Sequence, residues 1–229
     1  MKTIGLIGGT SWASTIDYYR IINEETNKRR GGLNFARIAL SSLDYGEIHA
    51  LSLKKDVEGI RSLLVEAAKK LEGIGAQCIL LCANTMHMHA EMVQDSVGIP
   101  LLHIADATAT EIKKKNMTNV GLLGTKLTME LDFYKKRLLG HGITAIVPPS
   151  EDRNFIHHAI DTELVKSLIV PETKSRFLNI INNLREQGAE GVILGCTEIP
   201  ILIKQTDTRL PVFDTTRIHS LAAVDFALA

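Results

Sequence analysis

The sequence predicts an α/β protein of two pseudosymmetric αβ domains, each with a parallel β-sheet, and a small-molecule site in the crevice between them. Short apolar runs alternate with longer amphipathic stretches, which is typical of βαβ units and parallel sheets. Three segments of the first half recur in the same order in the second half. The 229 residues suffice for one large or two small domains with a full core.

The sequence predicts strands and helices that alternate along the chain. Strands are expected at residues 2–7, 36–41, 77–82, 100–104, 118–123, 143–147, 190–195 and 211–213. Helices are expected at residues 14–29, 56–73, 86–94, 106–115, 127–139, 161–168, 172–187 and 216–228. Apolar residues such as Ile60, Leu64 and Leu71 recur at helical spacing, and those of 172–187 do the same.

The clearest repeat joins residues 76–85 and 189–198. In both copies a Gly-Ala pair leads into an apolar run that ends in small polar residues. The alignment sets Cys196 opposite Ala83, so only one of the two equivalent positions carries a thiol. A repeated strand end indicates that the two halves place two groups across one site.

Two further pairs of segments extend the repeat. They are residues 4–10 with 120–125, and residues 99–108 with 210–216. Such self-similarity indicates two similar halves of roughly 110 residues each. The first half is predicted to comprise residues 1–98 and 210–229, and the second to comprise residues 99–209.

Composition narrows the possible partners. Lys+Arg and Asp+Glu are balanced at 26 each, which leaves no electrostatic footprint for nucleic acid or anionic lipid. No apolar run reaches the length of a membrane span, and the chain opens into a strand without a signal-peptide pattern. The three cysteines lack a metal-ligand spacing, so no metal is expected. Free thiols indicate a reducing, cytoplasmic setting.

Small polar residues follow the predicted strands at their carboxyl ends, where α/β sheets bind ligands. Helix starts beyond these ends favour an anion, either a carboxylate or a phosphate. The expected uncharged donors are Thr10, Asn84, Thr85, Thr125 and Thr197. The glycines of the first strand end form neither a dinucleotide fingerprint nor a P-loop, so a nucleotide cofactor is not expected.

The cysteines differ in their expected roles. Cys78 and Cys82 are expected in the core. Cys82 lies one residue before position 83, and a one-residue shift along a strand turns a side chain to the other face. Cys196 is the expected functional thiol, because helix N-terminal amides beyond it would stabilise a thiolate. His87 is expected near the site or on a helix surface, and His219 within the last helix.

Two acidic residues precede predicted helices at matching positions of the two halves. They are Asp106 and Asp214. Capping of a helix N-terminus is the expected role of both, because a carboxylate at that position accepts hydrogen bonds from backbone N–H groups.

Several motifs together resemble the aspartate/glutamate racemase family. They are GLIGGTSWASTIDYYRIIN at 5–23, LCANTMH at 81–87, LLHIADAT at 101–108, LLGTKLTMELDFYKKRL at 122–138, VILGCTEI at 192–199 and PVFDTTRIH at 211–219. The match covers almost the whole chain and is nearest to the bacterial branch specific for L-aspartate and L-glutamate. The resemblance implies two pseudosymmetric αβ domains with the active site between them, no cofactor and a homodimer.

The family's chemistry explains the paired strand ends. Racemisation removes the Cα proton from one face and returns one to the other, so two acid/base groups are needed. In the family these are typically two cysteines, and the resemblance assigns the second to Cys196 and the first to position 83. In the L-specific branch the first position can be Thr, but Ala83 offers no proton.

Two explanations for Ala83 stay open: an engineered substitution, or a natural one-thiol relative. Three functions follow from them. The first is a cofactor-independent aspartate/glutamate racemase impaired at position 83. The second is a one-cysteine enzyme of decarboxylase type, and the third is a non-catalytic protein that binds an acidic amino acid or dicarboxylate.

Recognition of the substrate's side chain is predicted by position only. Ser52 is the closest match for a substrate-contacting residue on the loop after the second strand. Lys166 lies near the basic position of the second half, and Lys54 and Lys55 are alternatives for that basic residue. Glu198, which completes the Gly-Cys-Thr-Glu segment, is also expected to contact substrate.

Overall fold

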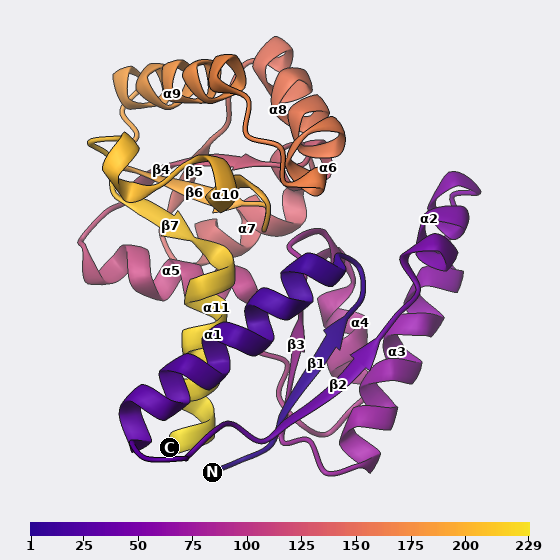
Figure 1. Ribbon diagram of the computed structural model, residues 1–229. Coiled ribbons are helices and arrows are strands. Elements are labelled where there is room, and N and C mark those ends of the chain that lie inside the picture. Colours follow the sequence, from indigo (N-terminus) through magenta and orange to yellow (C-terminus); the bar gives the residue numbers. More distant parts are fainter. The chain divides into compact units, whose positions relative to one another are not determined.

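The computed structural model describes residues 1–229, which fold into two compact units (Figure 1). Unit 1 comprises Met1–Ile104 and Thr216–Ala229, and unit 2 comprises Ala105–Thr215. These units differ from the predicted halves in residues 99–104 and 210–215. No helix is long and apolar enough to span a membrane.

Unit 1 is a three-stranded parallel sheet between helices, in the order β2-β1-β3. Its elements are β1 (Ile4–Gly8), α1 (Trp12–Arg30), β2 (Ile38–Ser42), α2 (Tyr45–Leu53), α3 (Val57–Gly73), β3 (Cys78–Leu81), η1 (Thr85–His89), α4 (Ala90–Asp95) and α11 (Thr215–Leu228). Helices α1 and α11 share a core with one face of the sheet through residues such as Leu6, Tyr18 and Val224. Helices α3 and α4 pack on the other face through residues such as Ile7 and Leu64.

Unit 2 has a four-stranded parallel sheet in the order β5-β4-β6-β7. Its elements are α5 (Ile104–Lys114), β4 (Asn119–Gly124), α6 (Lys126–Glu130), α7 (Asp132–Gly140), β5 (Thr144–Ile146), α8 (Ser150–Thr162), η2 (Leu164–Lys166), α9 (Pro171–Glu186), β6 (Gly191–Gly195), α10 (Ile199–Leu202), η3 (Gln205–Asp207) and β7 (Val212–Asp214). Helices α8, α9 and α10 contribute Ile156, Phe177 and Ile199 to one core with the sheet.

The two sheets repeat the same strand order, which confirms the predicted α/β fold class. Strands β1, β2 and β3 correspond to β4, β5 and β6. The counterpart of β7 in unit 1 is a single bridge from Ile79 to Leu101, where unit 2 pairs Val192 with Val212. The full strand predicted at residues 100–104 is therefore wrong. Only Ile79 and Leu101 pair, and Ile104 is already the first residue of α5.

The helix predicted at residues 161–168 is also wrong. Helix α8 runs from Ser150 to Thr162, so it begins eleven residues before the predicted start. Only the short η2 follows, and the residue after it, Ser167, has a left-handed φ of 58°. A non-glycine residue in that conformation cannot continue a helix.

Two further predictions of local structure need correction. The single helix predicted at 127–139 is divided into α6 and α7 by the extended backbone of Leu131, with ψ of 156°. Residues 45–53 form α2 instead of a loop, and Asp44 caps it by accepting from the Gly46 N–H at 2.8 Å.

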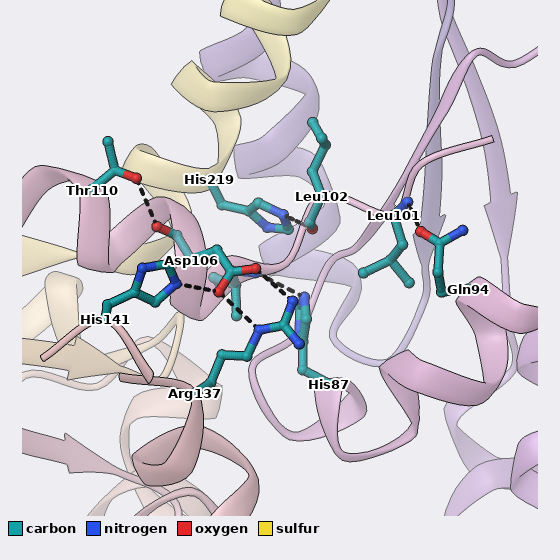
Figure 2. A network of polar contacts seen from close by, with 10 residues as sticks. His87, Gln94, Leu101, Leu102, Asp106, Thr110, Arg137, His141 and His219 are labelled. Atoms are coloured by element: carbon teal, nitrogen blue, oxygen red, sulfur yellow. Dashed lines mark hydrogen bonds and ion pairs between the residues drawn. The ribbon is translucent and has the colours of Figure 1, made fainter. Parts of the chain in front are cut away.

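Asp106 does not cap α5 as predicted, because it is the third residue of that helix. Its carboxylate accepts two hydrogen bonds from the Arg137 guanidinium, at 2.8 and 2.7 Å. The His141 Nε2 lies 2.8 Å from the same carboxylate, as Figure 2 shows. Asp106 therefore ties α5 to the carboxyl end of α7 within unit 2.

Candidate functional site

The carboxyl end of β3 separates the two neighbouring positions Cys82 and Ala83. Cys82 is 1% exposed and packs in the core with Ile4 and Tyr18. Burial raises the pKa of its thiol far above the ordinary value. Ala83 is partly exposed. Of these two side chains, that of Ala83 is therefore the accessible one. The repeat, which aligns Ala83 with Cys196, predicts the same register.

Strand β1 lies beside β3 in the same sheet. The turn after β1 requires glycine at position 9. Gly9 has a φ of +84°, and an added Cβ would lie 2.0 Å from the Leu43 carbonyl oxygen. The Gly9 N–H donates to Thr15 Oγ1 at 3.0 Å, which fixes the turn into α1. The Oγ1 of the next residue, Thr10, is buried and has no hydrogen-bond partner. A buried hydroxyl of this kind has capacity to bind a polar ligand atom.

The predicted donors after β3 lie at the start of η1. Asn84 is buried, with 4% of its surface exposed, whereas Thr85 is partly exposed. The Asn84 carbonyl accepts from the His87 N–H at 3.1 Å, which closes the first turn. The segment is thus held as a compact turn directly after the strand.

The carboxyl end of β6 carries a thiol in contact with a carboxylate. Cys196 is 7% exposed, and its Sγ donates to Glu198 Oε2 over 2.9 Å. Thr197 Oγ1 donates to the same oxygen at 2.7 Å. Glu198 is itself 8% exposed, so the thiol and the carboxylate share a nearly dry environment.

This environment keeps Cys196 protonated. Burial raises the pKa of the thiol well above its ordinary value, and the charge and hydrogen bond of Glu198 raise it further, with a smaller contribution from Asp161. A hydrogen bond from the Glu198 backbone N–H lowers the pKa of the thiol, as expected of an amide beyond the strand, but burial and the Glu198 carboxylate outweigh it, so a thiolate is not favoured. Helix α10 has only four residues, and the nearby carboxylates oppose a second negative charge.

The end of β4 lies directly beside that of β6. Gly124 pairs with Gly195, and a Cβ on Gly124 would lie 2.8 Å from the Gly195 carbonyl oxygen. Thr125 caps α6 by accepting from the Thr128 N–H at 3.4 Å, and its hydroxyl lies 3.1 Å from that of Thr128. Thr125 thus has a structural role in this unit beside its predicted role as a donor.

The two residues predicted to contact the distal group of the substrate are both exposed. Ser52 lies in α2, and Lys166 is the last residue of η2. Neither makes a hydrogen bond or ion pair that fixes it near a strand end. No group of three or more His, Cys, Asp or Glu side chains is arranged to hold a metal ion.

A cluster of buried histidines in unit 1 was not predicted from the sequence. His87, His103 and His219 are 2%, 8% and 0% exposed, and the His87 ring contacts both others edge-on at 4.6 and 5.5 Å between centroids. His219 Nε2 lies 2.7 Å from the Leu102 carbonyl, a contact shown in Figure 2, and its Nδ1 lies 2.8 Å from Tyr18 Oη. Since a carbonyl only accepts, His219 carries its proton on Nε2 and accepts from Tyr18.

Acidification is expected to destabilise the protein through His219. Burial, followed by the nearby His87, lowers the pKa of His219 to about 3. The unfolded chain therefore takes up a proton that the folded chain excludes, so this stability is full above about pH 6.5 and is lost as the pH falls. From about pH 7 to pH 5 the loss is about 2 kcal/mol. Urea unfolding followed by circular dichroism at both pH values measures it.

The variant His219→Gln keeps a donor for the Leu102 carbonyl and cannot titrate. We expect its free energy of unfolding to change with pH by about 2 kcal/mol less than that of the unmodified chain. His158→Gln, which replaces an exposed histidine of α8, is the control. The same pH dependence in the unmodified chain and in His219→Gln would contradict this assignment.

Known proteins resemble the chain over its full length. A family model described as Asp/Glu/Hydantoin racemase matches residues 7–223. The broad specificity amino-acid racemase RacX of Bacillus subtilis (strain 168) is 24% identical, over 99% of this chain and 98% of its own length. A crystal structure of a candidate Asp/Glu racemase from Yersinia pestis is 46% identical with a TM-score of 0.96 and covers 100% of both chains. An aspartate racemase homologue from Pyrococcus horikoshii OT3 is 37% identical, again over 100% of both chains, with a TM-score of 0.90.

Proposed function

Because the chain belongs to the Asp/Glu/hydantoin racemase family, we propose that it acts on the Cα–H bond of acidic amino acids by proton transfer without a cofactor. Cys196 serves one face of Cα. Position 83 is the place of the group that serves the other face, and Ala83 leaves that place without a proton carrier. The chain is therefore an amino-acid racemase that is impaired in its two-base chemistry.

The observation that carries this proposal is the hydrogen bond from Cys196 Sγ to Glu198 Oε2 at 2.9 Å. A thiol kept protonated beside a carboxylate is a proton donor with a neighbouring base. When Cys196 gives its proton to a carbanion at Cα, the thiolate beside Glu198 is destabilised and readily takes a proton back. In the reverse direction, Glu198 can accept the thiol proton while the sulfur removes one from Cα.

Donors around the α-carboxylate stabilise the carbanion as an enediolate. We assign this role to Thr10, Asn84 and Thr85, with Thr125 as a further candidate. The unpartnered Thr10 hydroxyl supports the assignment. Thr197 donates to Glu198 in this structure, so it orients the carboxylate, and Glu198 acts on Cys196 in addition to its predicted contact with substrate.

Acidic amino acids are the proposed substrates because two of the full-length relatives are described as a candidate Asp/Glu racemase and an aspartate racemase homologue. RacX has broad specificity, so neutral and basic amino acids belong in the same assay. Ser52 and Lys166 remain the predicted contacts of the distal carboxylate. The homodimer and the cytoplasmic location stay predictions.

Deuterium incorporation at Cα tests the proposed function. The chain is incubated in D₂O with L- and D-aspartate, L- and D-glutamate, and alanine and lysine for comparison, and proton NMR follows the loss of the Cα signal. We expect slow exchange of the acidic substrates, with one enantiomer exchanging faster because only one face has a thiol. Equal exchange of both enantiomers would place a second acid/base outside position 83. No exchange with measurable binding would support a non-catalytic binding protein, and CO₂ release a decarboxylase.

A further inference from the structure

Two buried side chains hold the backbone at the end of β3. Ser14 Oγ donates to the Cys82 carbonyl at 2.8 Å. His87 Nδ1 lies 2.9 Å from the Ala83 carbonyl. Both successive carbonyls that follow the strand are therefore fixed by side chains, one from α1 and one from η1.

The partners of His87 define its tautomer. A carbonyl oxygen only accepts, so Nδ1 carries the proton and donates to Ala83. The backbone N–H of Ile104 only donates, and it lies 3.2 Å from Nε2, which must therefore be unprotonated. One neutral imidazole thus links the strand end at Ala83 to the first residue of α5.

The ring of His87 cannot rotate freely to another position. It is 2% exposed and lies edge-on against His103 and His219. His219 is fixed in turn by Tyr18 and by the Leu102 carbonyl. A side chain whose neighbours are themselves fixed is suited to hold another group in a defined geometry.

The second half of the chain has no such imidazole. By the alignment of the repeat, the residue equivalent to His87 is Pro200. The Cys196 carbonyl accepts from the backbone N–H of Ile199 at 3.2 Å instead. The imidazole is thus specific to the strand end that carries position 83.

We propose that His87 is a positioning residue for the acid/base group at position 83. Its hydrogen bond to the Ala83 carbonyl fixes the peptide between residues 83 and 84. That peptide sets the direction of the side chain at position 83 and the place of Asn84. The inference rests on the proposed function, because it assigns position 83 to one face of Cα.

Two substitutions separate the two hydrogen bonds of the ring. Asn can place its amide nitrogen where Nδ1 lies and keep the bond to Ala83. Gln can place its carbonyl oxygen near Nε2 and keep the bond to Ile104. The matched control is His89→Asn, since His89 is a buried histidine of the same η1, and its Nδ1 has no hydrogen-bond partner.

The kinetic test is made in Ala83→Cys, where position 83 carries a thiol. We expect His87→Gln to lower kcat for racemisation about tenfold or more with little change in KM, because small misplacements of a catalytic group cost this much. His87→Asn and His89→Asn are expected to retain kcat within about threefold. Equal losses in His87→Asn and His87→Gln, or a change confined to KM, would overturn the proposal.

A measurement independent of turnover is made on the unmodified chain. In ¹⁵N NMR of the imidazoles, His87 should show a protonated Nδ1 and an unprotonated Nε2. Amide exchange at Asn84 and Thr85 should accelerate in His87→Gln and not in His87→Asn. If these results hold while Ala83→Cys shows no racemisation, the proposed function fails and the fixing of the strand end stands. An Nε2-protonated His87, or unchanged amide exchange, refutes the positioning role.

Discussion

Replacing Cys196 by alanine is expected to abolish exchange at Cα, with a loss of about 10³-fold or more. Cys196 belongs to the core cluster of unit 2, but it is 7% exposed, against 1% for Cys82, and its thiol donates to the Glu198 carboxylate at 2.9 Å. Without it, neither face of Cα has a positioned acid/base group. The measurement is Cα deuterium exchange in L- and D-aspartate, compared with the unmodified chain at equal protein concentration.

The other two cysteines provide matched thiol controls. Cys78 and Cys82 are 0% and 1% exposed within the core of unit 1. Burial raises the pKa of Cys78 to about 11 and that of Cys82 further still. Alanine at either position should change stability by about 1 kcal/mol, as small core truncations do, and leave exchange intact. Equal loss of exchange in Cys78→Ala and Cys196→Ala would discredit the assignment of Cys196.

Glu198→Gln tests how the carboxylate acts on the Cys196 thiol. The amide keeps the size of the carboxylate and removes its charge, so the pKa of Cys196 should fall toward its ordinary value. Activity that needs the protonated thiol should then be lost at a lower pH than in the unmodified chain. A pH–rate profile of exchange for both proteins shows whether its alkaline limb moves in this direction. An unmoved limb would mean that Glu198 does not control the proton of Cys196.

The repeat in the sequence predicts the register at the strand ends because side chains alternate between the two faces of a strand. Aligning Cys196 with Ala83 is enough to assign Cys82 to the core, and the structure has it there. The same repeat predicts two similar halves, each with a parallel sheet. These conclusions rest on local pattern and need no knowledge of contacts between distant residues.

The turn chemistry after β6 could not be predicted in this way. The hydrogen bond between Cys196 and Glu198 depends on how three residues turn after the strand, and the sequence pattern alone favoured a thiolate. Only the observed contact, with both groups buried, shows that the carboxylate raises the pKa of the thiol. Electrostatics at this site follow from distances that sequence spacing does not fix.

Apolar spacing was misleading between residues 161 and 168. The predicted helix includes Val165 and Leu168, yet these side chains are 50% and 51% exposed. The helix lies earlier, where Ile156 and Ile160 face the core. Periodicity reports which residues could form an apolar face and leaves open whether another element covers it.

The histidine cluster was missed because its members are far apart in the sequence. His87 and His219 contact each other only because α11 returns to the sheet of unit 1. A local signal did exist for His87. It follows the strand end by four residues, and a side chain on the first turn can reach back to the carbonyl at that distance in sequence.

The largest gain is expected from Ala83→Cys. Position 83 lies two residues after β3, where Ala83 is partly exposed and has no atom that can carry a proton. Water or a neighbouring group must then serve that face of Cα, and the loss of positioned acid/base catalysis typically costs about 10²–10⁴ in rate. A thiol at this position should therefore raise racemisation by about that factor and allow exchange from either enantiomer.

Ala83→Thr and Ala83→Ser test which property of the side chain at position 83 restores racemisation. Threonine supplies a hydroxyl of higher pKa than a thiol, so it should raise the rate less than cysteine and favour the L substrate, as the family resemblance implies. Serine supplies the same hydroxyl without the methyl group, so it separates proton transfer from the shape of the side chain. Polarimetry of L- and D-aspartate and L- and D-glutamate follows all four proteins. If the unmodified chain racemises both enantiomers as fast as Ala83→Cys, position 83 is not the second acid/base. The reaction must then take its second proton from a group that the repeat does not identify.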